Sequence, residues 1–257
     1  DPLQPIASAQ NAIRPDPSPL ARRGLLEVSN RPLVMGVLNI TPDSFSDGGQ
    51  WIELDRAVAR AEIMLDEGAD LLDFGAESTR PGGGIYGRGA EMVPVEEELR
   101  RLLPVLAAIR QRVSVPISVD TRKAAVARAA LDAGADIIND ISALADPEMA
   151  EVVARAGCPI VLMHSRGRLD SMQTDIEFDN VVEDVTKELA DLVDRAASQG
   201  ISRRQIVIDP GIGFGKTAKQ NLQLLCHLDR LSHLGPPVLL GASRKSFIGE
   251  VVGADPE

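Results

Sequence analysis

The chain has 257 residues, of which 44% are hydrophobic, and it carries a formal net charge of −11. That charge argues against a protein that binds nucleic acid or anionic membranes by electrostatic attraction, because both partners are polyanions. The length suits one large domain built from alternating strands and helices.

Cysteine usage and hydropathy bear on the compartment. The only two cysteines, Cys158 and Cys226, each lie in an apolar stretch, so we expect two buried free thiols and no disulfide framework. No apolar run reaches the roughly 18 residues of a membrane-spanning helix, and the N-terminus has no apolar signal core. These features predict a cytoplasmic protein without a membrane partner.

The chain divides into an N-terminal extension, residues 1–30, and one domain, residues 31–257. The extension holds five of the 17 prolines and shows little periodicity. From residue 31 onward a short apolar run, a polar turn and an amphipathic helix repeat. Helices are expected at stretches such as 56–68 and 121–134, each of which closes on glycine. Seven strands are expected, at 33–39, 70–77, 116–120, 136–140, 159–164, 205–210 and 237–243.

The polar residues of these runs favour a barrel. The runs are apolar nearly throughout, which predicts a parallel sheet covered on both faces. Each run nevertheless ends in a polar group, and a (β/α)8 TIM barrel gathers all such strand ends into one ring-shaped site. We therefore expect an α/β (β/α)8 TIM barrel whose eighth strand is missing, because only about fourteen residues follow the seventh run. Either the sequence given stops short of the natural C-terminus or the barrel is open. The polar ends are Asn39, Glu77 with Ser78 and Thr79, Asp120, Asn139 with Asp140, His164, Asp209 and Ser243.

Two polar loops follow the first two strands. In "NITPDSFSDGG", Asn39 and Asp43 offer oxygen ligands suited to Mg²⁺, although a Pro-Asp turn with a side-chain cap is the alternative. In "ESTRPGGG", Thr79 and Arg80 follow the second strand, and Arg80 could fork onto a phosphate or be an ordinary surface arginine.

Three short polar side chains end strands three, four and six. Taken singly, Asp120, Asn139 and Asp209 are best explained as caps of the turns that follow them. Together they could read the edge of a planar ligand with several donors, such as an aminopyrimidinone ring. His164 is better explained as a satisfied core histidine than as a general base.

The glycine-rich stretch "IDPGIGFGKT" matches neither familiar phosphate-binding pattern. A P-loop would need glycine at Pro210, and a dinucleotide fingerprint would need glycine at Lys216. In "GASRKSFIG", Arg244, Lys245 and Ser246 begin a helix, where an anion or simply solvent could meet the free N–H groups. Two aromatic residues on strand-end loops, Phe45 and Phe214, could wall a planar substrate.

Seven motifs together closely resemble those of the dihydropteroate synthases, the pterin-binding barrel enzymes of folate biosynthesis, in order from about residue 33 to 257. The resemblance implies an enzyme that joins hydroxymethyl-dihydropterin pyrophosphate to p-aminobenzoate with Mg²⁺ and releases pyrophosphate. The motifs are "LNITPDSFSDGG", "ESTRPG", "SVDTRK", "IINDIS", "IVLMH", "IDPGIGFGK" and "GASRKSFIG".

The resemblance also implies a role for each matching position. Hydrogen bonds to the pterin come from Asp120, Asn139 and Asp209, with Met163 against its face and Lys245 at its edge. The p-aminobenzoate contacts Phe45, Phe214 and Ser246, and the substrate-binding residues include Thr79, Gly241 and Arg244. The pyrophosphate and its metal face Asn39, Asp43, Thr79 and Arg80. The residues implied to take part in catalysis are Asn39, Asp47, Arg80 and Lys245, with Asp47 accepting from the attacking amine.

The implied mechanism is dissociative, with pyrophosphate leaving before the weakly nucleophilic arylamine attacks. The resemblance also implies a homodimer formed through outer helices, and a sulfonamide target. Two other functions stay open at this point. One is a pterin-binding methyltransferase domain, which would not need a pyrophosphate loop, and the other is a non-catalytic paralogue of the synthase.

Overall fold

The computed structural model describes residues 31–40, 50–77, 93–166 and 177–253. Six parallel strands form one sheet in sequence order. The strands are β1 (Met35–Asn39), β2 (Leu71–Gly75), β3 (Ile117–Asp120), β4 (Ile137–Asp140), β5 (Ile160–Met163) and β6 (Ile206–Asp209). Each coincides with one of the first six expected strands.

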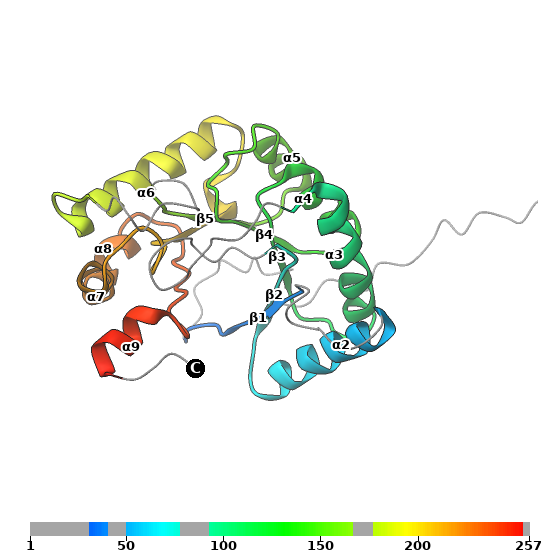
Figure 1. Ribbon diagram of the computed structural model, residues 1–257. Helices are drawn as coiled ribbons and strands as arrows, with labels where there is room; N and C mark the ends of the chain where they lie inside the picture. The colour runs from blue at the N-terminus through cyan, green and yellow to red at the C-terminus, as the bar shows by residue number, and fades with distance from the viewer. Residues whose placement is uncertain (1–30, 41–49, 78–92, 167–176, 254–257) are drawn as a thin grey trace, which may run out of the picture.

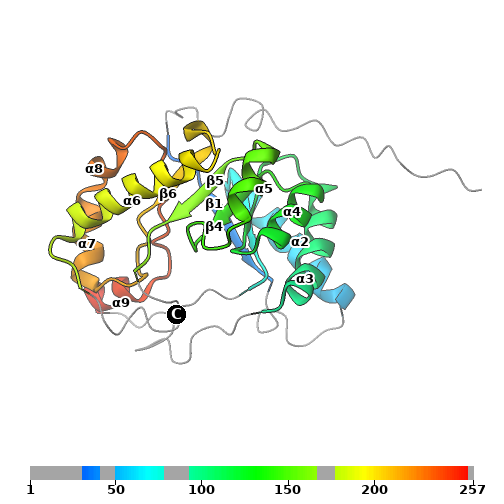
Figure 2. The ribbon, with the colours of Figure 1, turned by 90° about the horizontal axis from the view of Figure 1, so that it is seen from above.

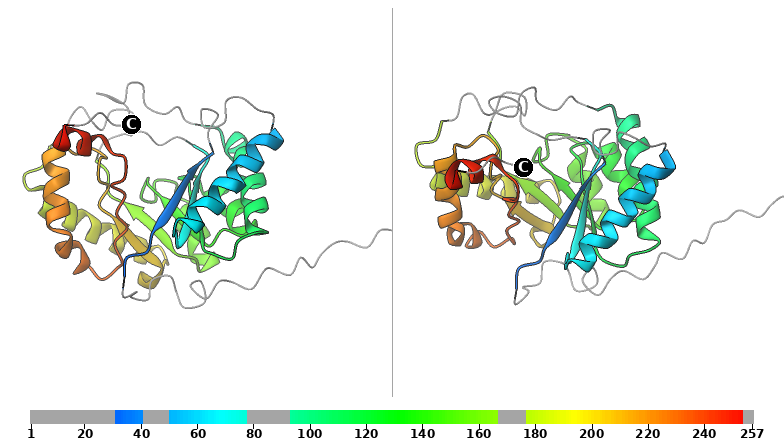
Figure 3. Two further views of the ribbon diagram at one scale, coloured as in Figure 1. Left: turned by 90° about the horizontal axis from the view of Figure 1, so that it is seen from below. Right: turned by 60° about the horizontal axis from the view of Figure 1, so that its bottom comes forward.

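Helices follow the strands and cover the outside of the curved sheet (Figure 1). The strands lie between α2–α5 on one side and α6–α9 on the other (Figures 2 and 3). The helices are α2 (Gln50–Asp66), α3 (Val95–Arg110), α4 (Ala124–Asp132), α5 (Met149–Ala156), α6 (Val181–Ser198), α7 (Ala218–Cys226), α8 (Leu228–Ser232) and α9 (Ser246–Val252), with a 3₁₀ turn η3 (Arg203–Gln205) before β6. In the described part of the chain, no helix is both long and apolar enough to cross a membrane.

Alternation along the strands divides the core into an outer and an inner layer. Outward residues such as Leu72, Phe74 and Ile117 pack on helices α2 to α4, and their counterparts on β4 to β6 pack on α5 to α7. The inward residues form a separate apolar cluster inside the barrel. Its buried members are Leu71, Ile137, Val161 and Val207, with Leu33, Met35 and Leu239 packed against them.

The expected seventh strand forms only one bridge. Val238 pairs in parallel with Ile208, through an N–H of Ile208 that donates to Pro237 O at 2.9 Å and an N–H of Leu239 that donates to Ile208 O at 2.8 Å. The prediction of a regular strand over 237–243 is therefore wrong, because two hydrogen bonds to one neighbour do not sustain a ladder. Among the described residues no strand closes the gap between this segment and β1, so the described sheet has an edge there.

Two further expectations concern the cysteines and the N-terminal extension. Cys158 is buried, but Cys226 is exposed, which corrects the expectation of two buried thiols. The reason is helical geometry: Cys226 lies two residues, about 200°, from the buried Leu224 on α7 and therefore faces outward. The extension over 1–30 lies outside the described residues and stays a prediction.

Candidate active site

The strand register brings three of the expected site residues into one row. Asn39 on β1 pairs with Gly75 on β2, Gly75 pairs with Asp120 on β3, and Asp120 pairs with Asn139 on β4. Gly75 has no side chain, and a Cβ placed there would lie 3.6 Å from Asp120 Oδ2 and 3.7 Å from Asn39 Oδ1. The amide of Asn39 and the carboxyl of Asp120 therefore flank the space above Gly75.

The same alternation places the remaining strand-end residues inward. Asn139, Met163 and Asp209 each lie two residues after a member of the inner apolar cluster, and Gly241 lies two after Leu239. Because side chains two apart share a face, the mouth of the barrel is polar directly above an apolar floor. Met163 and Asp209 are also register partners on β5 and β6.

Asp120 lies among other acidic groups. Burial, followed by the charges of Asp73, Glu98, Asp140 and Glu77, raises the pKa of its carboxyl well above the usual range. The helix after β3 begins only at Ala124, so Asp120 does not cap it. These influences disfavour the charged carboxylate, and a donor or a cation that arrives beside it would offset them.

Asp73 on β2 was not expected from sequence and lies beneath this row. It is the register partner of Ser118, and its Oδ2 accepts a long contact of 3.4 Å from Asn139 Nδ2. Among the described residues, Asp73 Oδ1 and Ser118 Oγ are buried without a hydrogen bond of standard geometry. Burial raises the pKa of Asp73. A charged residue at an inward position of an otherwise apolar strand was the sequence signal for it.

Asp209 ends β6 and shapes the glycine-rich loop. Its Oδ1 accepts from Gly211 N at 2.7 Å, which is a local turn contact of the kind expected for an aspartate at a strand end. Burial raises its pKa, while the Gly211 N–H and the Lys245 and Lys216 charges oppose that shift. One carboxyl oxygen is thus committed to the loop, and no side chain or backbone group of the described residues hydrogen-bonds the other.

Lys245 and Phe214 meet across the mouth. Lys245 Nζ lies 4.5 Å from the centroid of the Phe214 ring and donates to Ile212 O. Burial lowers the pKa of Lys245 to about 8, with Asp209 opposing, so the amine is largely protonated at neutral pH. Gly241 faces the same group, because a Cβ there would lie 3.9 Å from Lys245 Nζ.

The turn before α9 has the form expected from its sequence. Ser246 is the first residue of α9, and Lys245 occupies the cap position. Arg244 adopts a positive φ of 57°, a conformation that non-glycine residues rarely take. Backbone strain of this kind is common where a chain presents groups to a ligand.

Lys216 and His164 lie below the glycine-rich loop. Lys216 Nζ contacts the carbonyl oxygens of Gly211 and Phe214 and His164 Nδ1, each at 3.0 Å. His164 Nε2 lies 2.8 Å from Glu188 Oε2. The histidine is therefore a buried side chain with both ring nitrogens paired, as expected. The lysine is fully occupied by the protein, so the loop does not use it for phosphate.

Known proteins resemble the chain over most of its length. The family model described as pterin binding enzyme matches residues 35–257. The dihydropteroate synthase of Synechocystis sp. is 46% identical over 239 residues, which cover 93% of this chain and 80% of that protein. Among solved structures, Xanthomonas albilineans dihydropteroate synthase with 4-aminobenzoic acid matches with a TM-score of 0.79 and 48% sequence identity. The match covers 88% of this chain and 78% of the Xanthomonas chain. The chain belongs to the dihydropteroate synthase family of pterin-binding enzymes.

A longer relative carries the same unit. A protein of Haloferax volcanii named probable bifunctional folylpolyglutamate synthase/dihydropteroate synthase is 49% identical over 223 residues, or 87% of this chain. This chain spans only 26% of that relative. The dihydropteroate synthase unit is thus found in proteins of different lengths.

Five of the family's expected site residues lie outside the described ranges: Asp43, Phe45, Asp47, Thr79 and Arg80. The residues that border them are described. Glu77, directly before the second loop, is buried and forms ion pairs with Arg122 Nη2 at 3.0 Å and Lys123 Nζ at 3.2 Å. Its other contact is the N–H of Val93, where the described chain resumes, at 2.9 Å. Glu77 therefore links the described residues on the two sides of the second loop.

A magnesium ion fits the described part of the site only as a loosely held ion. No group of three or more histidine, cysteine or acidic residues suited to a metal occurs among the described residues. The exposed amide of Asn39 supplies a single oxygen. This donor set suits Mg²⁺, which keeps several waters and relies on substrate phosphates more than on a protein cage.

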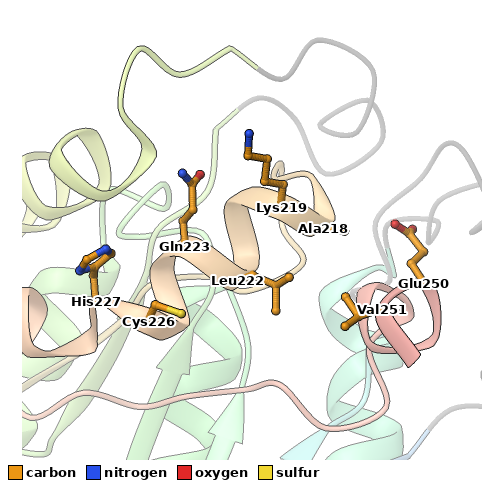
Figure 4. Close-up of a pocket in the computed structure, with 8 residues that line it drawn as sticks. All are labelled: Ala218, Lys219, Leu222, Gln223, Cys226, His227, Glu250 and Val251. Carbon is orange, nitrogen blue, oxygen red and sulfur yellow. The ribbon is translucent and has the colours of Figure 1, made fainter. Parts of the chain in front are cut away.

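A surface pocket of about 590 Å³ lies elsewhere, between α7 and α9 (Figure 4). None of the site residues expected for a dihydropteroate synthase lines it. The lining residues are Ala218, Lys219, Leu222, Gln223, Cys226, His227, Glu250 and Val251. The candidate site is therefore the barrel mouth and not this pocket.

Proposed function

We propose that the chain is a dihydropteroate synthase, which condenses hydroxymethyl-dihydropterin pyrophosphate with p-aminobenzoate to form dihydropteroate and pyrophosphate. The observation that carries the proposal is the row of Asn39, Gly75, Asp120 and Asn139, with Asp209 at the same end of the sheet on β6. Identity of 46% to a relative of that name over 93% of the chain supports it.

Pterin recognition would use the two carboxyls as acceptors. A pterin presents ring N–H and amino donors along one edge, and the free oxygens of Asp209 and Asp120 suit them. Asn139 offers an amide between the two. Lys245 would donate to the carbonyl edge, because its amine is largely protonated at neutral pH with a pKa of about 8. Met163 would supply an apolar surface from the inward face of β5.

The second substrate would lie beside Phe214. The Xanthomonas relative was solved with 4-aminobenzoic acid, and the aromatic ring of that molecule could pack on the Phe214 ring. The Ser246 hydroxyl and the Arg244 turn would receive its carboxylate. Phe45, from the loop after β1, would complete the wall.

Pyrophosphate departure requires charge neutralisation. Asn39 and Asp43 would hold Mg²⁺, which lowers the cost of the negative charge on the leaving group. Thr79 and Arg80 would bind the departing phosphates, and Asp47 would accept a proton from the attacking amine. The acidic groups around Asp120 would stabilise the positive charge that develops on the pterin methylene as the bond breaks.

Enzyme assays provide the test. Purified protein is given pterin pyrophosphate and Mg²⁺ with or without p-aminobenzoate, while coupled pyrophosphate release and product mass are followed. We expect amine-dependent formation of dihydropteroate and its loss on chelation. Pterin binding without amine-dependent product would contradict the synthase and favour a binding protein, whereas methyl transfer from a folate would favour the methyltransferase.

The family resemblance also supports three further proposals. The protein is a homodimer, which light scattering on a sizing column would check against the 27.4 kDa of one chain. It is cytoplasmic, as its buried free thiol Cys158 suits a reducing compartment. It is inhibited by sulfonamides, which would raise the KM for p-aminobenzoate without lowering kcat if they compete for the same pocket.

A further inference from the structure

Lys216 is a buried lysine that the proposed chemistry does not use. Its residue is 3% exposed, and burial, which Asp209 opposes, lowers the pKa of its amine to about 7. Gly211 O, Phe214 O and His164 Nδ1 each lie 3.0 Å from Nζ, and His164 O lies at 3.4 Å. The three nearer acceptors match the three N–H donors of the protonated amine and favour that form. Burying a cation is unfavourable unless its donors are paired, so these contacts are the reason that the lysine can stay inside.

The contacts continue outward through His164. Because Nδ1 accepts from Lys216, the ring proton is assigned to Nε2, which then donates to Glu188 Oε2 at 2.8 Å. Burial, followed by the nearby Lys216 charge, lowers the pKa of His164 to about 4, so the ring is neutral at pH 7. Glu188 is in turn paired with Arg166. The chain of contacts thus anchors Lys216 to α6.

The carbonyls that Lys216 holds belong to the loop that carries ligand-facing groups. Between Gly211 and Phe214 lies Ile212, whose carbonyl accepts from Lys245. The Phe214 ring lies against the same amine. A change in the direction of these carbonyls would therefore move both groups at once.

A second side chain holds the same loop from the helix side. Asn221 on α7 is buried, its Oδ1 accepts from Gly213 N at 2.8 Å, and its Nδ2 donates to Lys216 O at 3.3 Å. Asn221 thus fixes an N–H of the loop, while Lys216 fixes two carbonyls. The lysine in addition links the loop to the His164 side chain, at the end of β5.

We infer that Lys216 is a positioning residue, which holds the carbonyls of Gly211 and Phe214 and thereby places Phe214 and Lys245 against the two substrates. The identity of those substrates rests on the proposed function, whereas the loop geometry does not. The described hydrogen bonds of Lys216 go to the loop and to His164, and its charge also acts on Asp209, so the positioning role is tested on the loop itself and on the p-aminobenzoate that Phe214 would contact.

The test compares Lys216→Met with Lys219→Met. Methionine keeps the apolar stem but removes all three donors, and Lys219 is an exposed lysine three residues later on α7 (Figure 4). In Lys216→Met we expect hydrogen exchange of the 211–217 amides to be about tenfold faster or more, because about 1.4 kcal/mol of lost contacts corresponds to a factor of ten. Lys219→Met should exchange as the unaltered protein does.

Steady-state kinetics supply the second measurement. We expect the KM for p-aminobenzoate to rise about tenfold in Lys216→Met, by the same free-energy conversion. A merely structural role would lower kcat in proportion to the folded fraction and leave KM unchanged. Lys216→Gln retains two donors and should fall between lysine and methionine; it also provides the measurement if the methionine variant does not fold.

Three results would overturn the inference. They are unchanged exchange of the loop, equally faster exchange throughout the protein, and a loosened loop with an unchanged KM. If the unaltered protein makes no dihydropteroate, the proposed function fails separately, and the exchange comparison still decides whether Lys216 holds the loop.

Discussion

Gly211 is the position at which one added methyl group should do most damage. Its φ is +64°, and a Cβ built there would overlap the backbone carbonyl oxygen of His164 while lying 3.1 Å from the carbonyl carbon. Gly157, which ends α5, has a nearly equal φ of +66° but no atom within 4 Å of its Cβ position. Both alanine variants carry the same backbone strain, so their difference isolates the overlap.

The expected free energies follow from these surroundings. A left-handed backbone conformation costs alanine about 1 kcal/mol relative to glycine. The free energy of unfolding of Gly157→Ala should therefore fall by only that amount. In Gly211→Ala the His164 peptide must move, which disturbs the contact of its N–H with Asp209 O at 2.8 Å and that of Gly211 N with Asp209 Oδ1 at 2.7 Å. Each lost hydrogen bond costs roughly 1 kcal/mol or more. Together with the backbone strain, the free energy of unfolding of Gly211→Ala should therefore fall by about 3 to 4 kcal/mol.

Urea unfolding followed by circular dichroism measures both variants at 25 °C. We expect a lower midpoint for Gly211→Ala at an unchanged slope, together with weaker pterin binding, because Asp209 is displaced. Equal losses in the two variants would refute the reasoning, since the shared backbone strain would then be the whole effect. Unaltered pterin affinity in a destabilised Gly211→Ala would refute the link from the loop to Asp209.

Asp120→Asn and Asp209→Asn should each weaken pterin binding about tenfold to a hundredfold in calorimetry, because a charged acceptor is lost; unchanged affinity would remove the residue from the site. Pterin binding should also release a proton as Asp120 ionises, so equal binding heats in two buffers of different ionisation enthalpy would count against this. Ellman's reagent at pH 8 should modify Cys226 and spare Cys158, whose pKa burial raises to about 11; urea should then expose the second thiol. His164 has a pKa of about 4 in the folded protein, below the 6.5 of the unfolded chain. It therefore contributes stability above pH 6.5 that is lost as the pH falls to about 4, and by linkage this contribution amounts to about 3 kcal/mol. His164→Asn should reduce the dependence of the free energy of unfolding on pH over this range.

Much of the barrel was predictable from local pattern. Apolar runs of five to eight residues followed by amphipathic helices repeat along the chain, and short-range periodicity determines both element types. The first six strands accordingly appear where expected. The seventh was not predictable in this way, because whether 237–243 forms a ladder depends on its neighbours in the sheet and not on its own residues.

The residues missed by sequence reasoning are those whose partners are distant in the chain. Asp73 meets Asn139 across 66 residues, and Lys216 meets His164 across 52. Glu188 is one of many acidic residues on α6 and could not be distinguished from a solvated one without its contact to His164.

The sequence by itself determined which residue types end the strands and, through alternation, that Asn139 and Asp209 share the inward face with the apolar floor. These properties depend on neighbours two residues apart, which the chain order already contains. Only the tertiary structure decided that Asn39 and Asp120 flank the side-chain-free Gly75, and that the buried Lys216 amine contacts the carbonyls of its own loop and His164. Those outcomes depend on register between strands and on the burial of a charge, which are long-range properties of the folded chain.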